Sequence, residues 1–257
     1  MVRLRRTLSN SYSVLLLFLV WEGISRAGLV HPFLLPAPTA ICLKLVHLLV
    51  HGDLGQHLIV SLWRTGLSFI VAVAIAVPLG LAMAHIRLVR WFCEPIIAVG
   101  FPTPKIVFLQ ILILWFGFQD LPKIVMAAVE GIFPIVSATY LGALGVDRYL
   151  LWSARSMGTA GSRLLWKVTL PATLPQIMSG VQIALPICFI VIFVTEMLMG
   201  GGGLGDAMML AQRFADSEGV FVGIVMVSAL GYAAMRGVAC LRHALLRWHP
   251  ETQEWHA

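Results

Sequence analysis

The side chains of this chain that could bind or guide a solute are few, and they lie within long apolar runs. A charged or amide side chain inside a membrane-spanning segment is costly, and such a residue is therefore a candidate for a solute or ion pathway. The candidates are Lys105, Gln110, Glu130, Gln182 and Glu196. The alternative for each is an interhelical hydrogen bond that only fixes packing, and we favour that alternative for Gln182.

Glu130 is the only charged residue between Ile124 and Val146. A carboxylate in such a run needs a partner if its side chain faces other helices, because an uncompensated buried charge is strongly destabilising. Lys105, in the preceding apolar run, is the cation that we expect to pair with Glu130.

Other kinds of chemistry find no support in the sequence. It contains no Gly-x-Ser-x-Gly or H-E-x-x-H, so we expect no catalytic residue, and no G-x-x-x-x-G-K-[ST], so we expect no P-loop for ATP. The histidine spacings do not repeat a ligand face and the cysteines form no C-x-x-C pair, so we expect no metal and no bound cofactor. The residues concerned are His31, His47, His51, His57, Cys42, Cys93, Cys188 and Cys240.

The composition identifies the solvent as lipid. Hydrophobic residues make up 59% of the chain and charged residues 12%, and the mean hydropathy is +0.90. Soluble domains carry roughly 25% charged residues, about twice the fraction found here. A soluble core could not bury this much apolar surface, so much of it must face lipid. The net charge of +6 could attract nucleic acid, but the cations stand between apolar runs, and we expect a membrane partner instead.

The apolar runs predict an all-α polytopic membrane protein. A helix needs about 20 mostly apolar residues to cross the hydrocarbon core. The first run follows a basic flank without a clear cleavage site, so we expect an uncleaved first helix. We predict six spans, at roughly 10–28, 65–84, 95–117, 124–145, 175–197 and 219–241.

The distribution of Lys and Arg orients these spans, because short cytoplasmic loops are enriched in both residues. A cytoplasmic N-terminus gives twelve cations inside and five outside, and the C-terminus is then cytoplasmic as well. The inner set is Arg3, Arg5, Arg6, Arg87, Arg90, Arg148, Arg155, Arg163, Lys167, Arg236, Arg242 and Arg247, and the outer set is Arg26, Lys44, Arg64, Lys123 and Arg213.

Two outer segments are expected. The first, about 29–60, begins with a proline-broken piece and continues as a short apolar helix that is too interrupted to span, so we predict an interfacial helix. The second is "MGGGGLGDAM", residues 199–208, whose successive glycines let the backbone turn freely or let a partner approach closely.

One long segment is expected in the cytoplasm, at about 147–174, between the fourth and fifth spans. Apolar residues recur there at helical spacing among basic ones, and Gly158 and Gly161 interrupt the pattern. We predict two short helices meeting at a bend, with Pro171 and Pro175 marking the turn into the fifth span. Such a unit suits the docking of a soluble partner. The alternative is a basic helix lying on anionic lipid.

This segment carries a family resemblance. "SARSMG", followed by "LP" at residues 170–171, resembles the E-A-A…G…L-P loop of permease subunits of ABC importers. Nearly the whole chain is similar to the branch that serves nitrate, taurine and alkanesulfonates. The similar pieces are, in order, "LLPAPTA", "SLWRTGLSF", "FPTPKIVFLQILILWFG", "FPIVSATYLG", "TEMLMGGGGLG" and "LLRWHP".

The resemblance implies the type I importer fold, with six helices per subunit over one permease domain, residues 1–257. It implies a second permease subunit, expected to be a copy of this chain, two soluble ATPases that hold ATP and Mg²⁺, and an extracytoplasmic binding protein at a bacterial inner membrane. The first short helix of the loop would be the coupling helix, seated on the ATPase. The coupling residues it implies are Trp152, Ser153, Ala154, Arg155, Ser156, Met157, Gly158, Leu170 and Pro171.

The chain departs from this family pattern at several positions. Trp152 and Ser153 stand where the family has Glu and its first Ala, and Gly161 stands where Arg is frequent. Gln110 replaces a usual proline and could line the route. Glu196 lies in a shared piece beside the glycines, where the resemblance implies a role at the outer gate or against the binding protein.

The resemblance implies a translocation subunit of an ATP-driven importer of a small solute, such as a nitrate-, sulfonate- or taurine-like anion. The alternative is a secondary transporter or channel that works without an ATPase. Such folds often contain inverted repeats, and the halves of this chain do not visibly repeat. A purely structural membrane subunit is a third possibility, and it predicts no solute flux.

Overall fold

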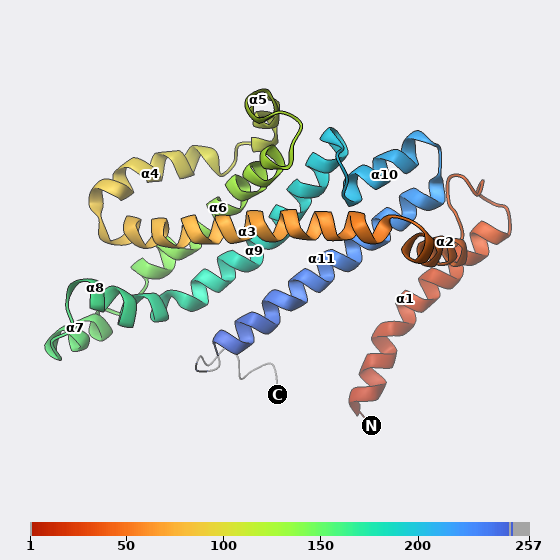
Figure 1. Cartoon of the computed structure of the whole chain (residues 1–257). Coiled ribbons are helices and arrows are strands. Elements are labelled where there is room, and N and C mark those ends of the chain that lie inside the picture. The colour runs from red at the N-terminus through yellow and green to blue at the C-terminus, as the bar shows by residue number, and fades with distance from the viewer. Residues whose placement is uncertain (1, 247, 249–257) are drawn as a thin grey trace. The chain divides into compact units, whose positions relative to one another are not determined.

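The computed structural model describes residues 2–246 and 248, and the side chains of these residues apart from 2–11 and 14. Every regular element in this part of the chain is a helix, which confirms the predicted all-α class (Figure 1). The elements are α1 (Val2–Arg26), α2 (Pro38–His51), α3 (Leu54–His85), α4 (Arg87–Gly100), η1 (Lys105–Phe108), α5 (Leu109–Phe116), α6 (Asp120–Leu144), α7 (Arg148–Ser156), α8 (Gly161–Leu164), η2 (Leu165–Thr169), α9 (Leu170–Met199), α10 (Leu204–Arg213) and α11 (Ser217–Leu245).

The helices form two compact units. The first contains Met1–Val60 and Gly202–Ala229, and the second contains Ser61–Gly201 and Leu230–Ala257. All the residues predicted to couple to a partner or to line a pathway belong to the second unit. The core of this second unit is apolar and comes from α3, α6, α9 and the end of α11, with Ala72, Ile135, Val181 and Val238 among its buried residues.

Four of the six predicted spans coincide with helices long and apolar enough to cross a membrane. These are Leu54–His85, Asp120–Leu144, Gly161–Met199 and Ser217–Leu245. The predicted span 10–28 corresponds to α1, which is not one of these four and whose side chains 2–11 and 14 lie outside the described set. Four predicted inner cations also fall outside the described side chains, namely Arg3, Arg5, Arg6 and Arg247.

The span predicted at 95–117 corresponds to a bent pair of helices. The chain forms α4 and then η1 with α5, and the two parts are bent by 96°. Pro102 and Pro104 lie in the break between them. Proline lacks the amide hydrogen of a helical bond, so two prolines separated by one residue interrupt the helical hydrogen bonds after α4.

The prediction of two short helices between the fourth and fifth spans is confirmed, although the turn predicted after them is wrong. Helix α7 ends before Gly158, whose φ is +80°, and α8 starts at Gly161, whose φ is +57°. Helix α8 then continues through the π turn η2 into α9 without a turn at Pro171 or Pro175. Pro171 is the second residue of α9, which directly follows the π turn η2, and it removes one backbone donor from this continuous helix.

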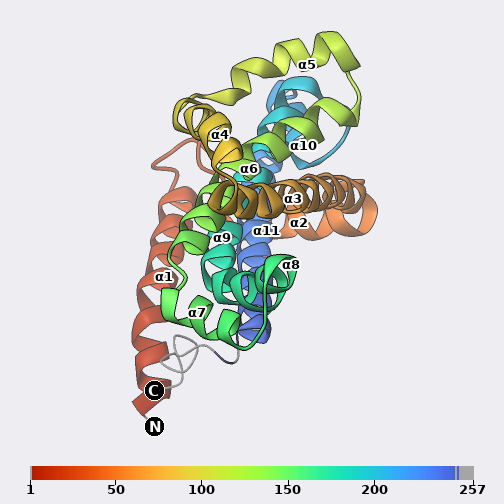
Figure 2. The same ribbon diagram turned by 90° about the vertical axis from the view of Figure 1, so that its left-hand side faces the viewer.

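Helices α6 and α9 lie side by side, and α7 and α8 lie at the end of this pair (Figures 1 and 2). Small residues let the two backbones approach. A Cβ atom added at Gly180 of α9 would lie 2.7 Å from the Cβ of Ala138 and 3.0 Å from the carbonyl oxygen of Pro134. A Cβ added at Gly131 of α6 would lie 2.6 Å from the Sγ of Cys188. Close backbone contact through small residues is a main source of helix association in membranes.

This packing predicts that Gly180→Ala destabilises the protein. The added methyl group would meet backbone atoms of α6, which cannot rotate away, so we expect a loss of about 1–3 kcal/mol, as for other overpacked cores. The control is Gly237→Ala in α11, where an added Cβ would meet no atom within 4 Å. Thermal denaturation of the two purified variants in detergent checks this, and equal melting temperatures would contradict the close packing of α6 and α9.

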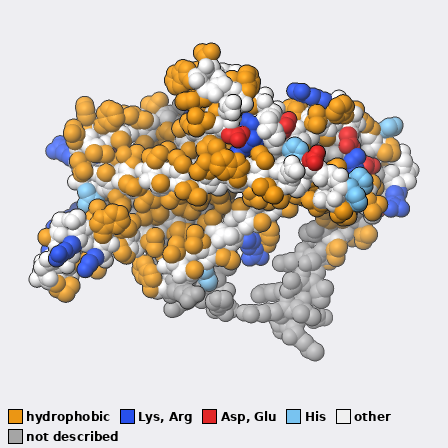
Figure 3. Space-filling model, in the orientation of Figure 1, with side chains coloured by type: hydrophobic (Ala, Val, Ile, Leu, Met, Phe, Trp, Pro, Cys, Tyr) orange, Lys and Arg blue, Asp and Glu red, His pale blue; other side chains and the backbone are white. Residues whose placement is uncertain are grey.

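The surface is mostly apolar, as expected for contact with lipid or with other subunits. Hydrophobic side chains cover much of the face drawn in Figure 3, and Lys and Arg form separate patches, one of which lies at the end with α7 and α8. Helix α11 has only 6% of its most apolar 18-residue window buried, against 50% for α6. The patch at α7 and α8 belongs to the segment predicted to lie in the cytoplasm, where Arg148, Arg155, Arg163 and Lys167 are exposed.

Candidate functional site

Helix α7 has well-defined signals at both ends. Asp147 caps its start, since its Oδ1 accepts a hydrogen bond of 2.8 Å from the backbone N–H of Tyr149. At its end the N–H of Thr159 donates to the carbonyl of Ala154 at 3.0 Å, and the N–H of Gly158 donates to that of Arg155 at 2.9 Å. These two bonds form a Schellman motif, which requires a left-handed residue at position 158.

Most of the predicted coupling residues are exposed on α7. Ala154 is buried and anchors the helix, whereas Ser153, Arg155, Ser156, Met157 and Gly158 are exposed. Trp152 is 56% exposed, and its ring lies 5.6 Å from that of Tyr149 in an edge-to-face arrangement. The exposed face of α7 thus combines aromatic and basic side chains, and we call it the α7 face.

The two remaining residues of the loop motif lie at the start of α9. Leu170 is partly buried against the core of the second unit, and Pro171 is exposed. They therefore attach the loop to the long helix and do not extend the α7 face.

The structure brings Lys105 and Glu130 together. The Nζ of Lys105 lies 3.0 Å from the Oε2 of Glu130, and the side chains are 7% and 18% exposed, so the predicted ion pair is confirmed as a contact. The same Nζ lies 3.2 Å from the carbonyl oxygen of Thr103 and 4.4 Å from the centre of the Phe133 ring. The bend between α4 and η1 is what carries Lys105 to α6.

An apolar cavity of about 650 Å³ adjoins this pair. Its walls come from α4, η1, α5 and α6, and Lys105 is the one charged residue among those that line it, in the part of the chain that the structure describes. The lining includes Ile96, Val99, Ile111, Trp115 and Phe133. The cavity can accept an apolar group beside a buried cation whose charge is already balanced by Glu130.

The two glutamines differ in their surroundings. Gln110 is exposed on α5. The Oε1 of Gln182 accepts a hydrogen bond of 2.9 Å from Arg242 of α11, which is the interhelical bond favoured above.

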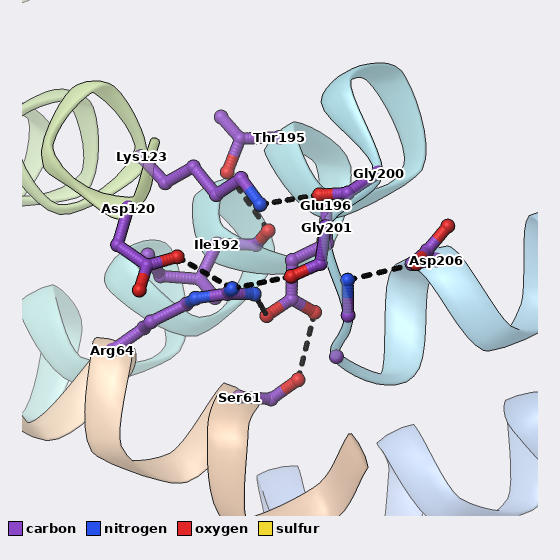
Figure 4. Close-up of polar contacts among 12 residues, drawn as sticks. Ser61, Arg64, Asp120, Lys123, Ile192, Thr195, Glu196, Gly200, Gly201 and Asp206 are labelled. Carbon is purple, nitrogen blue, oxygen red and sulfur yellow. Dashed lines mark hydrogen bonds and ion pairs between the residues drawn. The ribbon is translucent and has the colours of Figure 1, made fainter. Parts of the chain in front are cut away.

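Glu196 is part of a buried polar cluster (Figure 4). Its side chain is completely buried, its Oε2 accepts a 2.7 Å bond from the hydroxyl of Ser61, and its Oε1 lies 2.7 Å from Nη1 of Arg64. Arg64 reaches Asp120 as well, with Nη2 and Oδ1 2.5 Å apart. The cluster thereby joins α3, α6 and α9.

Lys123 completes this cluster. Its side chain is 1% exposed, and its Nζ donates a hydrogen bond to the carbonyl oxygen of Gly200, directly after α9. We call Ser61, Arg64, Asp120, Lys123 and Glu196 the α3/α6/α9 clamp. Of these five residues, only Glu196 was a candidate from the sequence. Arg64 and Lys123 were counted there as loop cations, and Ser61 and Asp120 were not singled out. The available signal was that Arg64 and Glu196 both occur in pieces shared with the family.

The potential metal ligands of the described part of the chain are its His, Cys, Asp and Glu residues. No group of three or more His, Cys, Asp or Glu residues among them lies close enough to hold a metal ion. The four cysteines are free, and Cys188 is buried between α9 and α6, where its Sγ lies 3.3 Å from the carbonyl oxygen of Ala127.

Known proteins resemble this chain over most of its length. Residues 76–246 match the family described as "Binding-protein-dependent transport system inner membrane component". The chain is 30% identical over 229 residues to a putative aliphatic sulfonates transport permease protein, SsuC, of Bacillus subtilis, covering 89% of this chain and 83% of that protein. It is 29% identical over 242 residues to the taurine transport system permease protein TauC of Escherichia coli, covering 92% and 88%.

A solved structure has the same fold. A chain of the MetNI methionine ABC transporter, in an inward-facing conformation, superposes with a TM-score of 0.66 at 19% identity, covering 75% of this chain and 95% of that one. The sequence matches favour the importer over a secondary transporter or channel. The chain therefore belongs to the family of binding-protein-dependent transport system inner membrane components, and it is a multi-pass permease subunit of an ABC transporter whose ATP is hydrolysed by a separate ATPase.

Proposed function

We propose that this chain is one of two identical permease subunits of a type I importer, each with six membrane-spanning helices and with both termini in the cytoplasm. The two compact units would then be parts of one permease domain over residues 1–257. The bent pair α4 and η1–α5 would count as one broken span, and α1 would be the first span. The arrangement agrees with the predicted excess of Lys and Arg on the inner side.

The observation that carries this proposal is the geometry of α7. It is a short, capped helix at the end of the tightly packed α6–α9 pair, and its aromatic and basic side chains are exposed. We propose that it is the coupling helix and that it seats in a groove of an ATPase. Because α8 continues through η2 into α9, a push on α7 would be passed to a helix of the transmembrane bundle rather than absorbed in a flexible loop.

The α7 face indicates what the ATPase groove should contain. Trp152 replaces the acidic residue of the family motif, so contact with the groove would be apolar and aromatic at this position. Arg148 and Arg155 are exposed and would suit an acidic rim. An anionic membrane surface would also attract the α7 face. The two alternatives differ because binding to the ATPase requires a folded protein partner, whereas binding to the membrane requires only lipid.

Trp152→Ala should weaken the complex with the ATPase. An aromatic anchor in an interface commonly contributes 2 kcal/mol or more, so we expect the dissociation constant to rise by about 30-fold. The control is Trp63→Ala. This change removes a half-exposed ring from α3 and leaves the α7 face unchanged. Titration of detergent-purified permease with the ATPase measures both, and equal losses would argue against docking at α7.

We propose that the solute is a small anion of the sulfonate or taurine kind, as the names of two relatives suggest, or of the nitrate kind, as the sequence resemblance implies. Lys105, Gln110, Glu130, Gln182 and Glu196 are the candidate residues of its path. The neutral Lys105–Glu130 pair beside the apolar cavity supports a solute with an apolar part better than a bare inorganic anion.

The experiment that tests this function is uptake into proteoliposomes that contain the permease and its ATPase, with binding protein outside and ATP inside. Labelled ethanesulfonate, taurine and nitrate are compared. We expect uptake of one of the sulfonates that depends on ATP hydrolysis and on binding protein. Uptake that proceeds equally without ATPase would refute the proposal.

A further inference from the structure

We infer that Arg64 and Lys123 are positioning residues: they fix the backbone that follows α9 against α3 and α6, so that a displacement of α7 at one end of α9 is carried to the other end of the bundle. This inference rests on the proposed function, because α7 is taken as the coupling helix. It concerns the α3/α6/α9 clamp, whose residues belong to other helices than α7.

The first ground is the burial of matched charges. Arg64 is 2% exposed, Lys123 is 1% exposed and Glu196 is 0% exposed. Burying charges is costly, and well-packed apolar residues often stabilise a core equally well. Stability alone therefore does not explain these buried charges. Arg64 makes bonds of 2.7 Å to Glu196 and 2.5 Å to Asp120, so its planar guanidinium fixes the relative position of α9 and α6.

The second ground is where the two cations meet the backbone. The C-terminal carbonyl groups of a helix lack partners and carry partial negative charge. Arg64 donates 2.8 Å from Nη2 to the carbonyl oxygen of Gly201, and Lys123 donates to that of Gly200. Gly200 and Gly201 have φ values of +69° and +81°, a conformation that residues with a side chain rarely adopt. The glycines and the cations together define this one turn.

The third ground is the tight packing of the two helices, α6 and α9, that connect α7 with the clamp. Helices α6 and α9 approach through glycines along their length. Helix α7 follows the end of α6, whereas the clamp lies at the start of α6 and the end of α9, at the other end of the pair (Figure 1). The clamp adds α3 through Ser61 and Arg64. The clamp thus adds polar contacts to the apolar packing of these three helices, and a displacement that enters at α7 would move their far ends together.

The test compares Arg64→Met with the double variant Arg64→Met, Glu196→Leu. The single variant leaves a buried carboxylate without its guanidinium, so both its melting temperature and its uptake of labelled ethanesulfonate should fall, the uptake by about tenfold or more. The double variant should recover the melting temperature, because its core is again uncharged at these positions. Its uptake should stay low while ATP hydrolysis by the complex continues.

Lys44→Met is the matched control. Lys44 is another cation of the predicted outer set, paired at 3.1 Å with Asp216 in a pair that is about one-third exposed, and its removal should change uptake less than twofold. A double variant that regains wild-type uptake would overturn the inference, since the clamp would then only balance charge. Wild-type uptake by Arg64→Met would overturn it as well.

A second readout does not depend on transport. Hydrogen–deuterium exchange of a peptide that contains Gly200 and Gly201 should become at least fivefold faster in the double variant than in the wild type, at equal melting temperature. If the wild-type complex takes up no ethanesulfonate, the proposed function fails for this solute, whereas unchanged exchange at the turn would overturn the positioning role itself.

Discussion

Gly158→Pro is expected to abolish uptake while leaving the protein in the membrane in normal amounts. Proline requires φ near −65°, whereas position 158 has φ +80°, and proline cannot supply the N–H that donates to the carbonyl of Arg155. The Schellman end of α7 would be lost, at a cost of about 3 kcal/mol, and the α7 face would change its direction relative to α9. Uptake into proteoliposomes and the yield of folded permease are the two measurements.

Two further variants at this position separate conformation from crowding. A Cβ at position 158 would meet no atom within 4 Å, so only the backbone conformation is at stake. Asparagine tolerates the left-handed region better than alanine, so Gly158→Asn should retain more uptake than Gly158→Ala. Normal transport by Gly158→Pro would refute the assignment of α7 as the coupling helix.

Neutralising Lys105 and Glu130 together is expected to harm the protein less than neutralising either one. Lys105→Met leaves a largely buried carboxylate, and Glu130→Gln leaves a buried ammonium, and each should cost about 3–5 kcal/mol of stability. The double variant removes both charges and leaves no uncompensated one, so its loss should be smaller than the loss of either single variant. Thermal denaturation and uptake of all four proteins complete the cycle.

This cycle also separates packing from transport. If the pair only fixes α6 to the bend after α4, the double variant should recover stability and uptake together. If Lys105 or Glu130 meets the solute in the path, stability should recover while uptake stays low. Strictly additive losses in both measurements would show that the 3.0 Å contact has no energetic coupling.

The sequence contained most of the helical scaffold because lipid imposes simple demands. Long apolar runs placed four spans correctly, and the isolated Glu130 implied a cationic partner that proved to be Lys105. Gly158 and Gly161 also predicted the bend after α7, since only a glycine readily takes a positive φ.

The errors have equally specific causes. The bend within the span predicted at 95–117 was missed, because hydropathy does not report the backbone hydrogen bonds that Pro102 and Pro104 remove. Counting Lys and Arg by loop treats each as solvated, so the buried positions of Arg64 and Lys123 were missed. Burial of a charge depends on which helices meet, and neither hydropathy nor spacing reports that.

The central claim is that an ATPase drives this permease through α7. The most direct measurement is a pull-down of the chain from its native host in a gentle detergent, with mass spectrometry of the proteins that remain attached, performed for the wild type and for Trp152→Ala. We predict that an ATPase with a P-loop stays with the wild type and is depleted from the variant. A wild-type chain that purifies alone and still conducts solute in liposomes would contradict the account.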